Sequence, residues 1–387
     1  VSDGDNGDDK MEVGARRENR SAWEIAEHYT DIFKQNLAQI NIREPNIWSK
    51  ATDHIAEQIA LIKRLEVGGY TYQTSDGVYF DTSKVADYGY LARLDVGGLE
   101  AGARVEVNEE KRNYTDFALW KFSPKGQKRQ MEWESPWGIG FPGWHIECSA
   151  MAMKYLGETI DIHTGGIDHI PVHHTNEIAQ SECATGKQFA RYWMHVAFLT
   201  VTGKKMSKSL GNFATLNDIV ERGYDPLVFR YMVLTSHYRS SLNFTWNNLD
   251  GIQKSLFSLR EKIVNWKLSD KDVPDNAFIR KFIERINDDI NTPQVIALMW
   301  DIANDKSLSD GVKKATILEF DKVLGLELEK NVVVEVPHEI KLLAEQRDKL
   351  RREKKWKESD LVREKIFEKG YEIKDTANGY IITKKGL

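Results

Sequence analysis

Hydrophobic residues recur at helical spacing in the first part of the chain. A helix is predicted over residues 22–38, where the apolar positions of one face are Ile25, Tyr29, Ile32 and Phe33. A second helix is predicted over 52–68, where a Gly-Gly pair ends the pattern. Residues 1–20 are charged and polar and are predicted to form a loop, and 70–80 have the alternation of a hairpin.

The middle of the chain alternates between helix and strand patterns. In order, these are a helix over 144–155, a strand over 159–163, a helix over 171–184 and a strand over 194–201. This alternation predicts a parallel α/β sheet, in which ligands bind in the loops after the strands. The loops at 164–173 and 202–211 are therefore the expected places for chemistry.

After Thr215 the pattern becomes helical. Thr215 and Asp218 have the spacing of a capping box, and Asp225-Pro226 predicts the start of another helix. Further helices are predicted over 245–267, 275–289, 293–304 and 310–323, followed by a linker over 331–337, helices over 338–354 and 356–369, and a closing hairpin. The longest apolar runs are too short to span a membrane, so no membrane partner is expected.

Composition narrows the class of protein. The 387 residues are 41% hydrophobic and 29% charged, which excludes a disordered, collagenous or disulfide-scaffold protein and predicts two or three domains. Net charge is −5, yet residues 341–387 hold 14 Lys and Arg against 9 Asp and Glu, which favours a nucleic-acid partner at that end. The two cysteines, Cys148 and Cys183, fit a reducing cytosol.

Three residues could form a metal site. His173 and Glu177 lie four apart and share a helix face, and Cys148 precedes them on another predicted helix. Thiolate, imidazole and carboxylate are all zinc ligands, and three protein ligands leave the fourth position open. On spacing alone, a buried structural cysteine and a His–Glu pair on a helix surface are the more usual interpretation. Cys183 is expected to be structural.

A second candidate is the loop from Lys204 to Asn212. Its lysines, hydroxyls and glycine suit a polyphosphate, although a generic cluster of this kind is usually a solvated surface loop. No Walker-type motif is present, and Gly165-Gly166 alone is weak support for a phosphate site.

Lys205-Met-Ser-Lys-Ser209 matches letter for letter the nucleotide-binding signature of class I aminoacyl-tRNA synthetases. Further motifs, in the right order along essentially the whole chain, resemble the cysteinyl-tRNA synthetases: Lys111-Arg-Asn-x-x-Asp-Phe-x-Leu-Trp-Lys121, Ser135-Pro-Trp-Gly138, Gly143-Trp-His-Ile-Glu-Cys-Ser-Ala-Met151, Asp161-Ile-His-x-Gly-Gly-x-Asp168, His173-His-x-Asn-Glu177 and Asp289-x-Asn-Thr-Pro293.

The resemblance implies an α/β fold: an incomplete class I Rossmann-type parallel sheet with an inserted connective domain, an α-helical anticodon-binding bundle and a small helix/hairpin module. The implied division is 1–140 (first nucleotide-binding half with the insertion), 141–214 (second half), 215–250 (stem-contact region), 251–330 (helical bundle) and 338–387 (anticodon module).

The implied activity is ligation of cysteine to tRNA(Cys) through cysteinyl-adenylate, with ATP and Mg²⁺, by a cytoplasmic monomer. One zinc ion would select the substrate by its sulfur, which a borderline-soft metal prefers to the hydroxyl of serine.

The implied roles are zinc ligands Cys148, His173 and Glu177; amino-acid contacts Trp144 and Asp168; nucleotide contacts Gly165, Gly166, Asp168 and Lys208; catalytic Lys205 and Lys208; and anticodon contacts Arg351, Trp356, Asp360 and Asp375. His174, beside a ligand, is expected to point elsewhere and only to support the site.

The chain departs from the family at its front. The family's fourth zinc ligand, a cysteine, and its His-x-Gly-His motif are both absent. The resemblance therefore implies that about the first 80–90 residues of the usual architecture are missing. On that basis we expect that this polypeptide alone does not aminoacylate.

Two alternatives remain open from the sequence. A cysteine:amino-sugar ligase has a similar catalytic domain but lacks a basic anticodon-reading tail, which this chain has. A non-catalytic tRNA-binding or zinc-binding protein would fit the missing front, while the intact Lys205–Ser209 motif argues against it.

Overall fold

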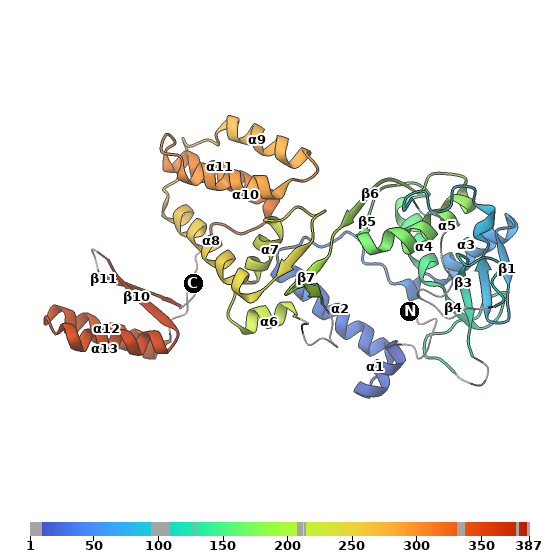
Figure 1. Cartoon of the computed structure of the whole chain (residues 1–387), viewed down its shortest axis with the longest axis horizontal. Helices are drawn as coiled ribbons and strands as arrows, with labels where there is room; N and C mark the ends of the chain where they lie inside the picture. Colours follow the sequence, from blue (N-terminus) through green and yellow to red (C-terminus); the bar gives the residue numbers. More distant parts are fainter. Residues whose placement is uncertain are drawn as a thin grey trace. The chain divides into compact units, whose positions relative to one another are not determined.

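The computed structural model describes residues 10–93, 109–124, 126, 128–206, 212, 214–330, 337–376 and 379–384. The chain divides into two compact units, one formed by Val1–Ala38 with Arg43–Phe198 and the other by Gln39–Ile42 with Leu199–Leu387. Figure 1 shows helices and strands in both units, so the predicted α/β class is confirmed. Among the described helices, none is long and apolar enough to cross a membrane.

The first unit begins with two helices, α1 (Lys10–Glu18) and α2 (Ala22–Gln39). The loop predicted over residues 1–20 is therefore wrong in its second half. Ala15 is buried, and the basic residues in the last turn of α1 favour the helix through its dipole. Between the helices, Ser21 and Glu24 exchange hydrogen bonds in the manner of a capping box at the start of α2.

An antiparallel sheet forms one side of the first unit. Its strands, in the order β1-β2-β3-β4, are β1 (Thr71–Gln73), β2 (Gly77–Phe80), β3 (Phe117–Phe122) and β4 (Gly140–Pro142). The short η1 (Ala51–Asp53) precedes α3 (Ile55–Val67), and η2 (Thr82–Lys84) follows β2. Helices α3 and α4 (Trp144–Leu156) pack against this sheet, so the predicted 70–80 hairpin is confirmed as part of a larger core.

The predicted parallel pairing is present in the second half of this unit. β5 (Ile160–Gly166) pairs in parallel with β6 (Ala190–Val196). Between them run η4 (Ile167–His169), a π-helical turn η5 (Ile170–His174) and α5 (Thr175–Thr185). The single strand predicted over 194–201 is wrong, because the segment divides into the end of β6 and a separate strand in the other unit.

That separate strand is β7 (Leu199–Val201), which starts the second unit. It lies between β8 (Lys204–Lys205), which is antiparallel to it, and β9 (Leu242–Phe244), which is parallel. Helices α6 (Leu216–Glu221) and α7 (Pro226–Leu234) connect β8 to β9. The capping box predicted from Thr215 and Asp218 is confirmed at the start of α6.

Four helices build the core of the second unit, close to their predicted ranges. They are α8 (Trp246–Asn265), α9 (Asn276–Asn287), α10 (Thr292–Asn304) and α11 (Asp310–Leu324). The buried Arg260 of α8 forms an ion pair with Asp225, which also caps the start of α7. This contact joins α7 to the helical core.

The last elements form a small module with its own hydrophobic core. It contains α12 (His338–Arg352), α13 (Trp356–Glu368) and the hairpin β10 (Tyr371–Thr376) with β11 (Gly379–Lys384). The buried apolar residues of the module are Ile340, Ala344, Val362, Ile366 and Ile373. Residues 331–336 of the predicted linker lie outside the described residues.

Candidate functional site

The three residues expected to bind a metal come together in the first unit. The potential ligand atoms of Cys148, His173 and Glu177 all lie within 4.8 Å of one another. They come from three elements, α4, the turn η5 and α5, which pack on one another. The structure therefore brings together a thiol, an imidazole and a carboxylate that the sequence separates by up to 29 positions.

His174 also faces this group, so the expectation that it points elsewhere is wrong. Its Nε2 lies 3.9 Å from Oε2 of Glu177, compared with 3.7 Å for Nε2 of His173. Both histidines end the wide π-turn, and spacings of three and four residues place both over Glu177. His163, on β5, comes closer still, with Nε2 2.8 Å from Oε2 of Glu177.

Among the three potential ligands, the buried carboxylate of Glu177 gives the strongest indication that the site binds a cation. Its side chain is 0% exposed. Its Oε1 has no hydrogen-bond partner among the residues that the structure describes. Leaving a buried charged acceptor without a partner is costly, and a bound cation would satisfy it. Thiolate, imidazole and carboxylate at this spacing suit zinc.

A second set of histidines hydrogen-bonds to the first. Nδ1 of His173 lies 3.0 Å from Nδ1 of His145, and Nδ1 of His174 lies 2.8 Å from Nε2 of His195. Burial lowers the pKa of both His145 and His174 to about 3. Neutral imidazoles can share one proton between two ring nitrogens, which fixes each ring in place.

The thiol of Cys148 is protonated in this arrangement. Burial, with the charge of Glu177 and Glu147 nearby, raises its pKa to about 12. Only the thiolate binds a metal, so a cation at this site would displace that proton.

Trp144 lies beside the same group. It opens α4, and its ring centroid is 4.6 Å from that of His173. The residue is 38% exposed, so part of it is open to solvent. Gly143, the N-cap of α4, allows this placement because any Cβ there would clash with the carbonyl oxygen of Ala118 in β3.

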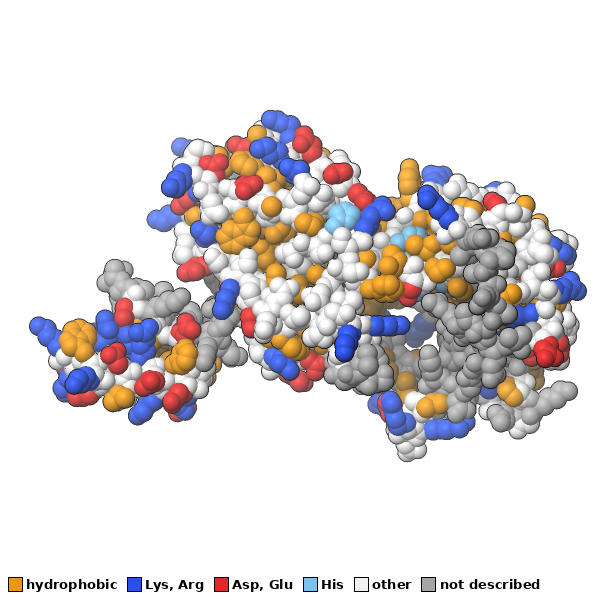
Figure 2. Space-filling model, viewed as in Figure 1, with side chains coloured by type: hydrophobic (Ala, Val, Ile, Leu, Met, Phe, Trp, Pro, Cys, Tyr) orange, Lys and Arg blue, Asp and Glu red, His pale blue; other side chains and the backbone are white. Residues whose placement is uncertain are grey.

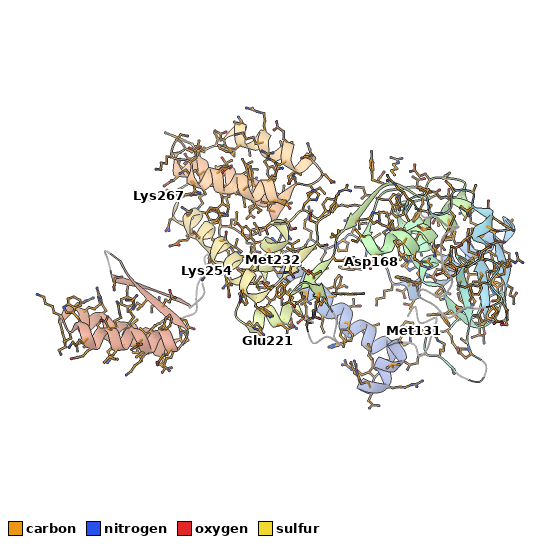
Figure 3. All side chains as sticks on the ribbon, in the orientation of Figure 1. Met131, Asp168, Glu221, Met232, Lys254 and Lys267 are labelled. Atoms are coloured by element: carbon orange, nitrogen blue, oxygen red, sulfur yellow. The ribbon has the colours of Figure 1, made fainter. Side chains whose placement is uncertain are left out.

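Gly165, Gly166 and Asp168 lie where β5 gives way to η4. A Cβ on Gly165 would be 2.7 Å from Nε2 of His174, and one on Gly166 would clash with the carboxylate of Asp168. Both glycines therefore give these side chains room to approach the strand. Asp168 is exposed, and Figure 3 labels it beside the connection from β5 to α5.

The predicted phosphate loop belongs to the second unit. Lys205 is exposed at the end of β8, and its backbone oxygen accepts a hydrogen bond from the Asn212 side chain. Met206 packs against the core of that unit. Lys208 lies outside the described residues.

Three of the four predicted anticodon residues contact one another in the C-terminal module. The guanidinium of Arg351 lies 5.4 Å from the ring centroid of Trp356, and its NH2 lies 3.3 Å from Oδ2 of Asp375. Asp360 is exposed on the same helix as Trp356, one turn further along. Figure 2 shows Lys and Arg side chains on this module with acidic side chains between them.

Comparison with known proteins decides the family. Residues 3–254 match the family model of the class I tRNA synthetase (C) catalytic domain. A protein of Burkholderia lata named cysteine–tRNA ligase 1 is 52% identical over 98% of this chain and 80% of its own length. The chain belongs to the class I cysteine–tRNA ligases. It is therefore an enzyme of the aminoacyl-tRNA synthetase class.

Other relatives and a solved structure agree with this family. The cysteine–tRNA ligase of Treponema denticola is 39% identical over 97% of this chain and 83% of its own length. Mycobacterium tuberculosis methionyl-tRNA synthetase in complex with methionyl-adenylate gives a TM-score of 0.53, with 14% identity, covering 82% of this chain and 80% of that one. At this identity the likeness concerns the fold alone, which is that of a class I synthetase.

Sequence reasoning missed several polar residues of this ligase that surround the candidate sites. His163 stands in the same motif as Gly165 and Asp168, but the alternation of a strand gave no sign that it would meet Glu177. His145 and His195 come from α4 and β6, and only the packing of these elements brings them to His173 and His174. Arg347, beneath Asp375, was also missed.

Proposed function

We propose that the enzyme to which this sequence belongs activates cysteine with ATP and Mg²⁺ to form cysteinyl-adenylate, and then transfers the cysteine to tRNA(Cys). The observation that carries the proposal is the convergence of Cys148, His173 and Glu177 around a buried carboxylate oxygen for which the described residues offer no hydrogen-bond partner. In this proposal they hold one zinc ion. The two free thiols fit a reducing compartment, and we assign the enzyme to the cytoplasm as a monomer.

Selection of the amino acid takes place at this group of side chains. When bound, zinc would supply a Lewis acid that binds the substrate's thiolate in preference to a hydroxyl. His145 holds the ring of His173, and His163 holds the carboxylate of Glu177, so the ligand atoms are oriented in advance. Trp144 then forms one wall of the cysteine pocket, beside His173.

Two separate groups of residues are assigned to the nucleotide: two glycines and an aspartate that follow β5, and two lysines of the Lys204–Asn212 loop. Gly165 and Gly166 would border the nucleotide at the end of β5, and Asp168, for which Gly166 leaves room, would accept hydrogen bonds from the adenylate or from the amino group. Lys205 and Lys208 would place positive charge on the pyrophosphate as it leaves.

The tRNA is held in part by the C-terminal module. A planar guanidinium, an aromatic face and carboxylates suit the unstacked bases of a single-stranded loop. Arg351, Trp356 and Asp375 offer these groups on one contiguous surface, and Asp360 adds a further exposed carboxylate. In this proposal they read the anticodon.

The metal assignment can be tested by loading the protein with Co²⁺, which reports thiolate ligation through its charge-transfer absorption. The two cysteines provide a matched pair of variants. Cys148→Ser should lose the charge-transfer band, and Cys183→Ser, whose thiol also lies half-buried but outside the group, should keep it. Adding cysteine to the wild-type protein should strengthen the band, because a second thiolate joins the metal.

Serine is the control ligand for this experiment. It should leave the cobalt spectrum unchanged, since its hydroxyl is a poor ligand for a borderline-soft metal. If Cys148→Ser keeps the full charge-transfer band, the ligand assignment is wrong. If cysteine and serine act alike on the wild-type protein, selection through sulfur is wrong even where the metal binds as proposed.

A further inference from the structure

Arg347 lies buried beneath the C-terminal hairpin. Its side chain, on α12, is 1% exposed. NH1 donates to Oδ1 of Asp375 at 2.7 Å, and NH2 donates to Oδ2 at 3.0 Å. This two-point contact fixes both the position and the plane of the carboxylate, which a single hydrogen bond would not do.

Above Arg347, three side chains that are at least partly exposed form a connected series. Asp375 is 43% exposed and contacts Arg351, which is itself 35% exposed and lies over the ring of Trp356. Asp375 is thus the link between the buried arginine and the exposed one. Any rotation of its carboxylate would move Arg351 relative to Trp356.

The burial of Arg347 has a cost in the folding free energy of the module. Nε of Arg347 is buried and, within the described part of the chain, has no hydrogen-bond partner. Burying a guanidinium has a desolvation cost, and its partner Asp375 is 43% exposed, so solvent screens the ion pair that offsets this cost. The apolar cluster around Ile366 already provides a core, so stability alone does not account for an arginine here.

We propose that Arg347 is a positioning residue for base recognition, acting through Asp375 on Arg351 and Trp356. It cannot touch a base itself, because it is covered and both terminal nitrogens are engaged by Asp375. This inference rests on the proposed function, in which this surface reads the anticodon. It adds that the accuracy of reading depends on a residue that never meets the RNA.

The test compares binding of the full chain to tRNA(Cys) transcripts with the anticodon GCA and to transcripts with one anticodon base changed. In Arg347→Lys the charge remains but the two-point contact is lost. The ratio of affinities for the GCA transcript and the changed transcripts should fall by about tenfold, because one charge-assisted hydrogen bond is removed.

Arg352→Lys is the matched control. Arg352 follows on the same helix, is 79% exposed and pairs with Asp348. Its replacement should change binding to all the transcripts by the same factor and leave their ratio unchanged. The circular dichroism spectrum and the thermal midpoint of both variants are measured alongside, so that loss of folding is seen directly.

A second comparison asks whether Arg347 acts through Asp375. In an Asp375→Asn background, Arg347→Lys should have no further effect on the ratio, whereas an effect of the same size in both backgrounds would contradict the inference. If Arg347→Lys loosens the module, Arg347→Met replaces it, since an apolar side chain of similar length fills the same space without the two-point contact.

The outcomes separate the two proposals. If the wild-type chain does not distinguish the transcripts, the assignment of anticodon reading to this surface is wrong. Anticodon reading is supported if the wild type distinguishes the transcripts and Arg351→Ala does not. If Arg347→Lys then behaves like the wild type, the positioning role of Arg347 is wrong.

Discussion

Gly165 shows how a single hydrogen atom in place of a methyl group shapes the candidate metal site. A Cβ at this position would be 2.6 Å from Cε1 of His174 and 2.8 Å from Nδ1 of His169. These distances are shorter than van der Waals contact, so both rings occupy space that only glycine leaves free. His174 in turn contacts Glu177 and His195.

We expect Gly165→Ala to weaken metal binding about tenfold or more. The displaced ring of His174 would no longer hold the carboxylate of Glu177 in position for the metal. The measurement is a titration of the metal-free protein with Zn²⁺ against a competing chelator. Gly251→Ala is the control, since that position on α8 has open space around it and the change should leave zinc affinity unchanged. Equal affinities for both variants would contradict the prediction.

The residues of the candidate site were predictable where they share a motif and unpredictable where they meet by packing. Helical spacing placed His173 and Glu177 on one face, but the full set with Cys148 was implied by the family resemblance and not by spacing alone. His174 could not be placed, because a π-turn gives no periodic signal that separates it from a regular helix. The contacts of His163 with Glu177 and of His195 with His174 depend on how β5 and β6 pack against α5 and η5, which the sequence does not specify.

Among the elements, the junction between α7 and α8 depends on one carboxylate with two tasks. Oδ1 of Asp225 accepts a hydrogen bond from the backbone of Leu227 and caps α7. Oδ2 lies 2.7 Å from NH1 of the buried Arg260, which also donates to the carbonyl oxygen of Leu326. The cap was visible in the sequence as Asp-Pro, whereas the ion pair was not.

Asp225→Asn separates these tasks, because asparagine is an equally good cap but carries no charge. We expect it to lower the free energy of unfolding of the second unit by about 3 kcal/mol, since Arg260 would remain buried without its counter-charge. Hydrogen exchange of the α8 amides measures this change. Glu319→Gln, which removes an exposed pair with Lys322, should change it by about 0.5 kcal/mol or less. A similar result for both variants would count against the prediction.

The boundaries of elements could be predicted where local sequence sets them, and could not where pairing with a distant segment sets them. Helices with strong periodicity, such as α10 and α11, agree with the ranges predicted from the sequence to within one residue. The strand predicted over 194–201 failed because apolar residues continue from β6 into β7, and only their pairing with different partners separates them.

At the scale of the whole molecule, the candidate metal site and the C-terminal module have separate hydrophobic cores. The basic charge of residues 341–387 also falls on that module rather than on the acidic remainder. We therefore expect that a mutation or truncation in one of these parts leaves the binding function of the other part unchanged.

We expect a chain that ends at residue 330 to bind tRNA(Cys) more weakly and with a shallower dependence of log affinity on log salt, because basic side chains are removed. Its zinc affinity should equal that of the full chain. Binding isotherms at several salt concentrations and the chelator titration measure the two quantities. A parallel loss of zinc would show that the module supports the metal site, contrary to the separate cores.

The separation of the two cores has a consequence for errors in translation. In the proposed function, one part of the polypeptide selects the amino acid. Another part selects the tRNA by its anticodon, and therefore the codons at which that amino acid is incorporated. A lesion in the α12–α13 module would leave cysteine chemistry intact and deliver cysteine to the wrong tRNA. A lesion at the thiol–imidazole–carboxylate group would deliver the wrong amino acid to the right tRNA. The two faults would leave different signatures in a proteome: cysteine at foreign codons in the first case, and serine at cysteine codons in the second.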